Sequence, residues 1–144
     1  MNRSVVVSAS RSGLRQSIAV GPHLLQADET IDSGGNDAGP NPYELLLASL
    51  GACTGMTVRM YAERKQWPLQ SVRVRLAHSK LYVADCADCE TREGMLDHIE
   101  REISFIGDLS DGQRQRLLDI ANRCPIHRTL TSEVRIDTFK TEGD

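Results

Sequence analysis

The sequence predicts an α+β fold in a single domain of 144 residues. Three short strands come first, followed by one long apolar helix, two alternating strands, a second helix and a last strand. Strands and helices in separate blocks are typical of the α+β class. A chain of this length fits one domain, and no repeat or long linker divides residues 1–144.

The N-terminal part is predicted to form three short strands. Residues 4–9 and 14–20 are rich in valine and isoleucine, with a turn at 10–13 between them. A third strand is expected at 23–26, and the loop at 32–40 is rich in glycine, aspartate, asparagine and proline. Branched residues favour strands, and glycine and proline interrupt them.

A long helix is predicted over residues 42–65. Asn41 suits the N-cap and Pro42 the first helical position, while Glu44 can return to the Asn41 amide in a capping box. The run Leu45–Val58 is apolar on all sides, so we expect this half of the helix to be buried on every face. The run is too short to span a bilayer.

Two antiparallel strands are predicted at 70–83 and 95–107, joined by the polar connection 84–94. Apolar and charged residues alternate along the first strand, as in a half-buried sheet. In the second strand Arg101 has the parity of the apolar positions and is therefore expected to point inward.

The C-terminal part is predicted to contain a helix and a strand. Ser110 and Gln113 suit a second capping box, and the helix that follows should end near Asn122. The last strand is expected at 132–139.

Composition excludes some classes of function. A net charge of −3 argues against nucleic acid as the main partner. The start of the chain, residues 1–7, is followed at once by polar residues, unlike a signal peptide. We therefore expect a cytoplasmic protein without a membrane partner, whose cysteines are reduced, metal-bound or catalytic.

Two cysteines form a candidate redox pair. Cys53 lies within the apolar helix, and Cys124 lies in the string Arg-Cys-Pro-Ile-His-Arg at 123–128. Pro125 suits the first position of a short helix, which would place the Cys124 thiol at an N-cap where the helix dipole favours thiolate. The cations of this string would add positive charge. The plainer alternatives are a small buried residue at Cys53 and solvated charges around Cys124.

A second pair of cysteines lies in the polar connection. Cys86 and Cys89 have the spacing of half a zinc site, and only His78 and His98 lie near enough in sequence to complete it. The surrounding acidic residues would raise the thiol pKa values, which argues against a thioredoxin-like motif. We favour a surface hairpin tip with incidental thiols or a labile disulfide, keep zinc as an alternative, and expect no cofactor.

Two motifs resemble one known family. Gly39–Thr54 resembles the central helix of the OsmC family (osmotically induced protein C), which includes the organic hydroperoxide resistance proteins. Cys124–Leu130 resembles the family's second cysteine motif, in the branch with Cys-Pro-Ile/Val-His, and the similarity covers about 28–138. The resemblance implies the OsmC-like fold, an intertwined homodimer with two long central helices packed against antiparallel sheets. The small residues Gly51 and Gly55 fit such close helix packing.

The resemblance also implies an activity. Family members are thiol-dependent peroxidases that reduce organic hydroperoxides with two cysteines, and an external dithiol of lipoyl or thioredoxin type restores them. Cys53 would be the peroxidatic residue and Cys124 the resolving one. A thiolate attacks the peroxide, a sulfenic acid forms, and the second thiol condenses with it to a disulfide.

The activating residues of the family match less well. In the hydroperoxide resistance proteins an arginine of the N-terminal hairpin and a glutamate at the helix start help the cysteine to ionise. Arg11 is the best match for the arginine and Arg15 the second. Tyr43 stands where the glutamate is expected, and Glu44 follows one place later, about 100° around the helix. Capping accounts for Glu44, and Arg101 is a hypothetical substitute cation.

The displaced glutamate supports an alternative function. The chain would then be a non-catalytic dimer that senses redox state or binds a small ligand. A third hypothesis, a zinc-stabilised structural or adaptor dimer, depends only on Cys86 and Cys89.

Overall fold

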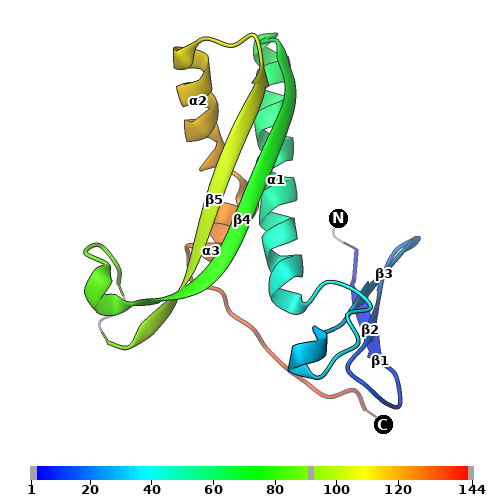
Figure 1. Ribbon diagram of the computed structural model, residues 1–144. Helices are drawn as coiled ribbons and strands as arrows, with labels where there is room; N and C mark the ends of the chain where they lie inside the picture. The colour runs from blue at the N-terminus through cyan, green and yellow to red at the C-terminus, as the bar shows by residue number, and fades with distance from the viewer. Residues whose placement is uncertain (1–2, 91–92, 143–144) are drawn as a thin grey trace. The chain divides into compact units, whose positions relative to one another are not determined.

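The computed structural model describes residues 3–90 and 93–142 in two compact units, Met1–Ala48 and Ser49–Asp144 (Figure 1). The unit boundary falls within the long helix α1 (Pro42–Lys65). Helices and strands occur together, and the sheets are antiparallel, as an α+β fold requires.

The first unit contains a three-stranded sheet. The strands β1 (Val6–Ala9), β2 (Gln16–Val20) and β3 (His23–Ala27) pair in chain order, each antiparallel to the next. A short 3-10 helix, η1 (Ile31–Ser33), follows. The three strands predicted from the sequence are thus confirmed, although β1 and β2 begin two residues later than expected.

A buried aspartate holds the loop that leads to α1. The Asp28 carboxylate accepts hydrogen bonds from the backbone amides of Glu29, Asn36 and Ala38, at 2.8 to 3.1 Å. These bonds, led by that of Ala38, lower the pKa of Asp28 despite its burial, and the charge of Arg15 adds to the effect. The loop is therefore fixed by one side chain that is stable as a carboxylate.

The start and end of α1 are those predicted. The Asn41 amide donates to Glu44 Oε1 and the Glu44 amide to Asn41 Oδ1, both at 2.8 Å, which is a complete capping box. At the other end Gln66 has a positive φ of 57°, and the Trp67 amide donates to Ala62 O at 2.9 Å. A left-handed residue followed by a proline at position 68 stops the helix.

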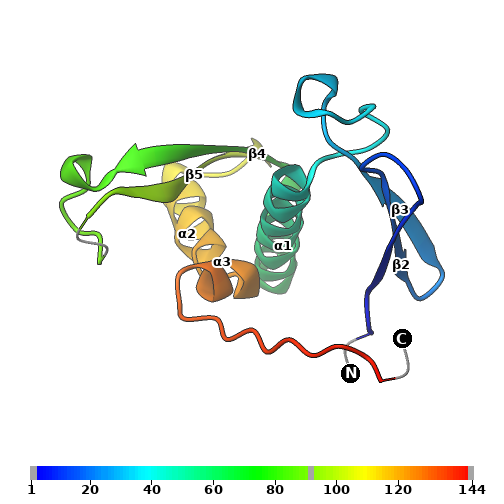
Figure 2. The same ribbon diagram turned by 90° about the horizontal axis from the view of Figure 1, so that it is seen from below.

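The second unit is built on a long hairpin. Its strands β4 (Leu69–Tyr82) and β5 (Met95–Gly107) pair antiparallel, and η2 (Val83–Asp85) lies at the tip. The helices α2 (Asp111–Ala121) and α3 (Pro125–Leu130) follow. The hairpin lies on one side of these helices and of α1, as Figure 2 shows.

The core of this unit lies between the hairpin and the helices. It consists of buried residues from α1, from α2 and from the segments that flank the hairpin: Val58, Tyr61, Ala62, Leu69, Leu109, Leu117, Ile120 and Ala121. Val72, Ile103 and Phe105 of the hairpin pack against them. The prediction of a half-buried hairpin is therefore confirmed, because alternate side chains of its strands face the helices.

Both helix caps predicted in this unit are present. The Gln113 amide donates to Ser110 Oγ at 3.1 Å, and the Ser110 amide donates to Gln113 Oε1 at 2.9 Å. In α3 the Cys124 side chain is the N-cap and Pro125 takes the first position. Short, local patterns thus fix where both helices begin.

The prediction of a strand at 132–139 is wrong for the single chain. These residues are exposed and form no strand, and Ile136 and Phe139 are 81% and 87% exposed. A strand requires a neighbour that takes up its backbone hydrogen bonds, and the described part of this chain offers none to 132–139. The local sequence favours extended backbone, but a strand also needs a neighbouring strand, which the local sequence does not specify.

The expectation that the Leu45–Val58 half of α1 is buried on every face is also wrong for one chain. Within that half Thr54 and Val58 are fully buried, whereas Met56 is 66% exposed, and Met60 in the next turn is 67% exposed. One side of the helix packs within the second unit, and the side with these methionines is open in the described part of that unit. A Cβ added to Gly55 would meet nothing within 4 Å.

By length and composition alone α1 could also cross a membrane. Its most apolar window of 18 residues has a mean hydropathy of 1.2, and 28% of the window is buried. The helix nevertheless packs against the start of β4, where Arg59 donates to Leu69 O at 2.6 Å and to Gln70 O at 3.0 Å. Central helices of folded domains have the same composition, so we interpret α1 as a core helix.

Candidate active site

The structure brings Cys53 and Cys124 together within one chain. Cys53 lies in the middle of α1 and is half-buried, whereas Cys124 is fully buried at the start of α3. The hydroxyl of Thr54, the residue that follows Cys53, lies 3.9 Å from Cys124 Sγ, and the Cys53 thiol helps to lower the pKa of Cys124. Two neighbouring thiols are the arrangement that disulfide formation requires.

Local structure positions Cys124. Its amide donates to Ala121 O at 3.4 Å, which continues the end of α2. Its sulfur accepts a hydrogen bond from the His127 amide at 3.3 Å, as an N-cap side chain does. The sequence Cys-Pro-Ile-His therefore places an amide donor on the sulfur, as the sequence analysis predicted.

Arg101 reaches the same site from β5. Its Nη1 donates to Thr54 Oγ1 at 2.8 Å and to Ala121 O at 3.3 Å, and its Nη2 donates to Asn122 Oδ1 at 2.8 Å. The inward direction predicted from strand parity is correct. The guanidinium thus connects the hairpin, α1 and the end of α2 beside Cys124.

Thr54 links this arginine to the thiol. Its hydroxyl donates to Leu50 O at 2.7 Å and lies 3.9 Å from Cys124 Sγ. Thr54 and Asn122 were not predicted as site residues. A hydroxyl side chain directly after Cys53 in a mainly apolar run was the available signal for Thr54.

The surroundings of Cys124 favour its thiolate. Burial raises the pKa of the thiol, but the His127 amide, the Thr54 hydroxyl and the Cys53 thiol lower it, and the charge of Arg101 lowers it further. The net result is a pKa of Cys124 below its ordinary value of 9.0. Cys124 is therefore ionised over a wider pH range than a free cysteine.

His127 acts through its backbone rather than through charge. Burial and the charge of Arg101 both lower the pKa of this imidazole from its ordinary value of 6.5. The ring is therefore mainly neutral at pH 7, contrary to the expectation that His127 adds positive charge. The residues Arg123 and Arg128 are exposed, and the cation that acts on Cys124 is Arg101.

A pocket of about 350 Å³ adjoins these groups. It is lined by residues of α1, β5 and the C-terminal end of α3: Leu50, Asp97, Ile99, Arg101, His127, Leu130 and Thr131. Three of these side chains are aliphatic, and Arg101 and His127 both influence Cys124. The pocket can hold a small molecule with an apolar body and a polar end.

The two activating residues suggested by resemblance lie in the first unit. Arg11 is exposed in the turn between β1 and β2, and lines a hollow of about 440 Å³ with Arg15 and Asp28. The Glu44 carboxylate accepts from the Asn41 amide, which is its capping role. The action of Arg11 and Glu44 on Cys53, which belongs to the second unit, stays a prediction.

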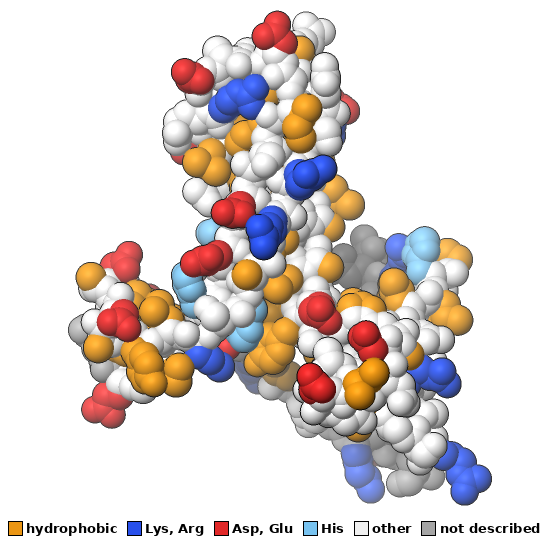
Figure 3. Space-filling model, in the orientation of Figure 1, with side chains coloured by type: hydrophobic (Ala, Val, Ile, Leu, Met, Phe, Trp, Pro, Cys, Tyr) orange, Lys and Arg blue, Asp and Glu red, His pale blue; other side chains and the backbone are white. Residues whose placement is uncertain are grey.

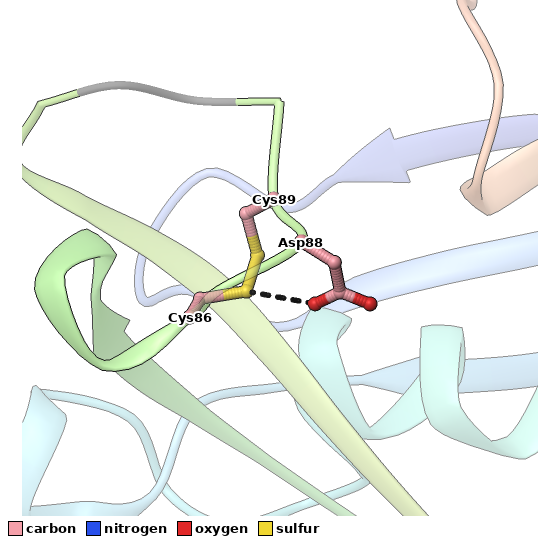
Figure 4. Close-up of a disulfide and its surroundings, with 3 residues drawn as sticks. All are labelled: Cys86, Asp88 and Cys89. Carbon is pink, nitrogen blue, oxygen red and sulfur yellow. Dashed lines mark hydrogen bonds between the residues drawn. A yellow bond between two sulfur atoms is a disulfide. The ribbon is translucent and has the colours of Figure 1, made fainter.

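The second cysteine pair is a disulfide at the hairpin tip. Cys86 and Cys89 are bonded, with a Cα–Cα distance of 5.7 Å, and Asp88 Oδ1 lies 3.7 Å from Cys86 Sγ (Figure 4). Exposed hydrophobic side chains, Tyr82 and Met95 among them, lie beside acidic ones at this tip (Figure 3). Of the interpretations left open by the sequence, the structure contains the disulfide.

The zinc alternative lacks its second half in the described residues. The potential ligand atoms that lie within 4.8 Å of one another belong to Cys86, Asp88 and Cys89, without a histidine. Of the two histidines considered, His78 pairs with Asp97 at 2.7 Å. Disulfide sulfurs have no thiolate to offer a metal, so only the reduced pair could bind one.

Comparison with known proteins defines the class. The family model for OsmC-like proteins matches residues 34–139, which include parts of both units. This match covers well over half of the chain, and the protein therefore belongs to the OsmC-like family. No curated protein matches the sequence.

Solved structures share the fold at low sequence identity. The OsmC-like protein from Mycoplasma pneumoniae is 17% identical, with 90% of this chain and 87% of that chain covered and a TM-score of 0.70. The organic hydroperoxide resistance protein from Elizabethkingia anophelis is 15% identical, with 91% of this chain and 89% of that chain covered and a TM-score of 0.68. The organic hydroperoxide resistance protein OsmC from Legionella pneumophila is 18% identical, with 89% of each chain covered and a TM-score of 0.64. The OsmC-like fold expected from the sequence is thus confirmed.

Proposed function

We propose that this protein is a thiol-dependent peroxidase that reduces organic hydroperoxides with Cys53 and Cys124. The nearness of Cys53 to Cys124 within one chain, where the hydroxyl of the adjacent Thr54 lies 3.9 Å from Cys124 Sγ, is the observation that carries the proposal. Similarity in fold to proteins described as organic hydroperoxide resistance proteins supports it.

The exposure of the two thiols supports Cys53 as the attacking residue and Cys124 as the resolving one. Cys53 is half-buried and Cys124 is fully buried, so a peroxide reaches Cys53 first. The Cys53 thiolate attacks one peroxide oxygen; the S–O bond forms, the O–O bond breaks, and the alcohol leaves after protonation. The Cys124 thiolate then attacks the Cys53 sulfur; the S–S bond forms and hydroxide leaves to become water.

An external dithiol closes the cycle in this proposal. It reduces the Cys53–Cys124 disulfide by thiol exchange and takes up the two oxidising equivalents of the peroxide. A lipoyl group or a thioredoxin-type protein has the required chemistry. We place the reaction in the cytoplasm, where such reductants keep thiols reduced.

The adjoining pocket supports an organic substrate. Leu50, Ile99 and Leu130 offer an aliphatic lining, and Arg101 and His127, which both act on Cys124, line the same pocket. An alkyl or aryl hydroperoxide would gain apolar contacts that hydrogen peroxide cannot make. We therefore expect cumene hydroperoxide to react faster than hydrogen peroxide.

We also propose that the working form is an intertwined homodimer. The exposed side of α1, with Met56 and Met60 and an open Gly55, is an apolar helix face suited to a second copy of the same helix. The unpaired segment 132–139 alternates in a way that suits a strand in a sheet shared between chains.

The test follows the thiols of the reduced protein after mixing with cumene hydroperoxide or hydrogen peroxide. Wild type should lose two site thiols and form the Cys53–Cys124 disulfide, Cys53→Ser should not consume peroxide, and Cys124→Ser should stop at oxidised Cys53. If wild type consumes peroxide no faster than Cys53→Ser, the protein is not a peroxidase. The alternative of a redox-sensing or ligand-binding dimer, which the capping role of Glu44 favours, would then take its place.

A further inference from the structure

Arg101 carries a positive charge into the site without a carboxylate to balance it. Its partners are the neutral oxygens of Thr54, Ala121 and Asn122. Among residues 3–90 and 93–142 no acidic side chain forms an ion pair with it. Asp97, which lines the same pocket, is engaged by His78 and Lys80, each at 2.7 Å. A half-buried cation without a counter-ion is costly, so an anion near Arg101 is favoured.

The group that can supply this anion is Cys124. The titratable groups that face it are Cys53 from α1, Arg101 from β5 and His127 from its own helix, while α2 contributes the neutral atoms of Ala121 and Asn122. Arg101 is the cation of this set, because the His127 ring is mainly neutral at pH 7. A Cys124 thiolate is therefore the counter-ion that the site provides for Arg101.

The hydroxyl of Thr54 can adapt to both states of Cys124. A hydroxyl has one hydrogen and two acceptor lone pairs. Arg101 Nη1 occupies one lone pair at 2.8 Å, and the hydrogen points to Leu50 O at 2.7 Å. With Cys124 as a thiol, the second lone pair can accept its S–H across the 3.9 Å contact. With Cys124 as a thiolate, the hydroxyl hydrogen can turn to the sulfur instead.

We propose that Arg101, acting through Thr54, is a positioning residue that holds the resolving thiol Cys124 as a thiolate ready to attack oxidised Cys53. The proposal rests on the proposed function for its role in turnover. It differs from the expectation that Arg101 replaces a missing cation beside Cys53, because the hydrogen bonds lead to Cys124. Burial protects Cys124 from peroxide, so its thiolate serves the second step and limits over-oxidation of Cys53.

The first test measures ionisation of Cys124 without any peroxide. In a protein with Cys53, Cys86 and Cys89 replaced by serine, the pH midpoint of thiolate absorbance at about 240 nm belongs to Cys124 alone. Arg101→Gln should raise this midpoint by about one pH unit, since an opposite charge at close range shifts a pKa by roughly that amount or more. Arg101→Lys should return part of the shift. Arg75→Gln, on an exposed position of β4, is the matched control and should leave the midpoint unchanged.

A second variant covers the case in which Arg101→Gln does not fold. Thr54→Val keeps the side-chain volume and removes the hydroxyl, so it should also raise the midpoint. An unchanged midpoint in Arg101→Gln, or in Thr54→Val where the first variant is unfolded, overturns the proposal. So does an Arg101→Lys midpoint no lower than that of Arg101→Gln.

The second test reads the consequence in the otherwise wild-type chain. After cumene hydroperoxide, the ratio of Cys53–Cys124 disulfide to Cys53 sulfinic acid, measured by mass spectrometry, should fall about tenfold in Arg101→Gln, the effect of a one-unit pKa shift on thiolate content. An unchanged ratio would contradict the role in resolution. If wild type forms neither product, the proposed peroxidase fails, and the titration still decides whether Arg101 ionises Cys124.

Discussion

The two site cysteines have the same side chain and different surroundings. Cys53 is half-buried on a helix, whereas Cys124 is buried beneath an amide, a hydroxyl and a guanidinium. Burial alone would raise the pKa of the Cys124 thiol, and the polar groups around it lower that pKa by more than burial raises it. Cys53 is thus the more accessible thiol, and Cys124 is the thiol whose surroundings favour the thiolate, so the two residues are not equivalent.

Another residue with a fixed charge state is Asp28. It is 3% exposed and accepts three backbone hydrogen bonds, which lower its pKa below the ordinary value of 3.8. A carboxyl with a lowered native pKa contributes stability above its unfolded pKa and loses it as the pH falls through the native one. Asp28→Asn should therefore lower the melting temperature clearly at pH 7 and much less near pH 3.

The control for this prediction is Asp32→Asn, at an exposed position of η1. This variant should melt like wild type at both pH values. If the deficit of Asp28→Asn is as large at pH 3 as at pH 7, the carboxylate charge is not what holds the loop.

At the scale of elements, α1 depends on small residues for its contact with β4. A Cβ at Gly51 would lie 2.8 Å from Leu76 Cδ1, so the helix and strand approach closely at this point. This contact is within one chain, whereas the resemblance attributed Gly51 to packing between chains. The tip of a leucine side chain can move, so the contact limits large residues more than small ones.

Two substitutions at Gly51 test this packing. Gly51→Ala should change the free energy of unfolding little, because a gain of about 1 kcal/mol in helix propensity offsets the contact with Leu76. Gly51→Leu should lower it by about 1–3 kcal/mol through overpacking, as measured by urea denaturation. Adding Leu76→Ala should then recover part of the loss. Strictly additive effects of the two changes would show that the residues do not meet.

At the scale of the whole molecule, one chain leaves apolar surface that a second copy can cover. Met56 and Met60 project from α1, and the segment 132–139 has no strand partner among residues 3–90 and 93–142. Met60→Glu should therefore convert the proposed dimer to monomers, because a charge in an apolar interface loses its hydration. Sedimentation velocity measures the change, and Gln115→Glu, which adds the same charge to an exposed position of α2, should stay dimeric. A wild-type monomer at micromolar concentration would contradict the dimer itself.

What could be predicted from the sequence depends on the same scales. Most strands, the helix caps and the inward direction of Arg101 depend on neighbouring residues and were predicted. The strand at 132–139 and the burial of Leu45–Val58 on every face require contacts that the described part of one chain does not supply, and these two predictions were wrong for the single chain. The bonds of Arg101 to Thr54 and Asn122 join residues 47 and 21 positions apart, and no local pattern encodes such contacts.

The uncompensated charge of Arg101 also bears on how easily the site is reduced again. When Cys53 and Cys124 join in a disulfide, the anion that balances this guanidinium disappears, so the oxidised site is less favourable than the reduced one. Each unit by which the pKa of Cys124 is lowered corresponds to about 1.4 kcal/mol, or roughly 30 mV in the two-electron potential. A Cys53–Cys124 disulfide should thus be a stronger oxidant than an ordinary structural one, and in the proposed function an external dithiol would reduce it again.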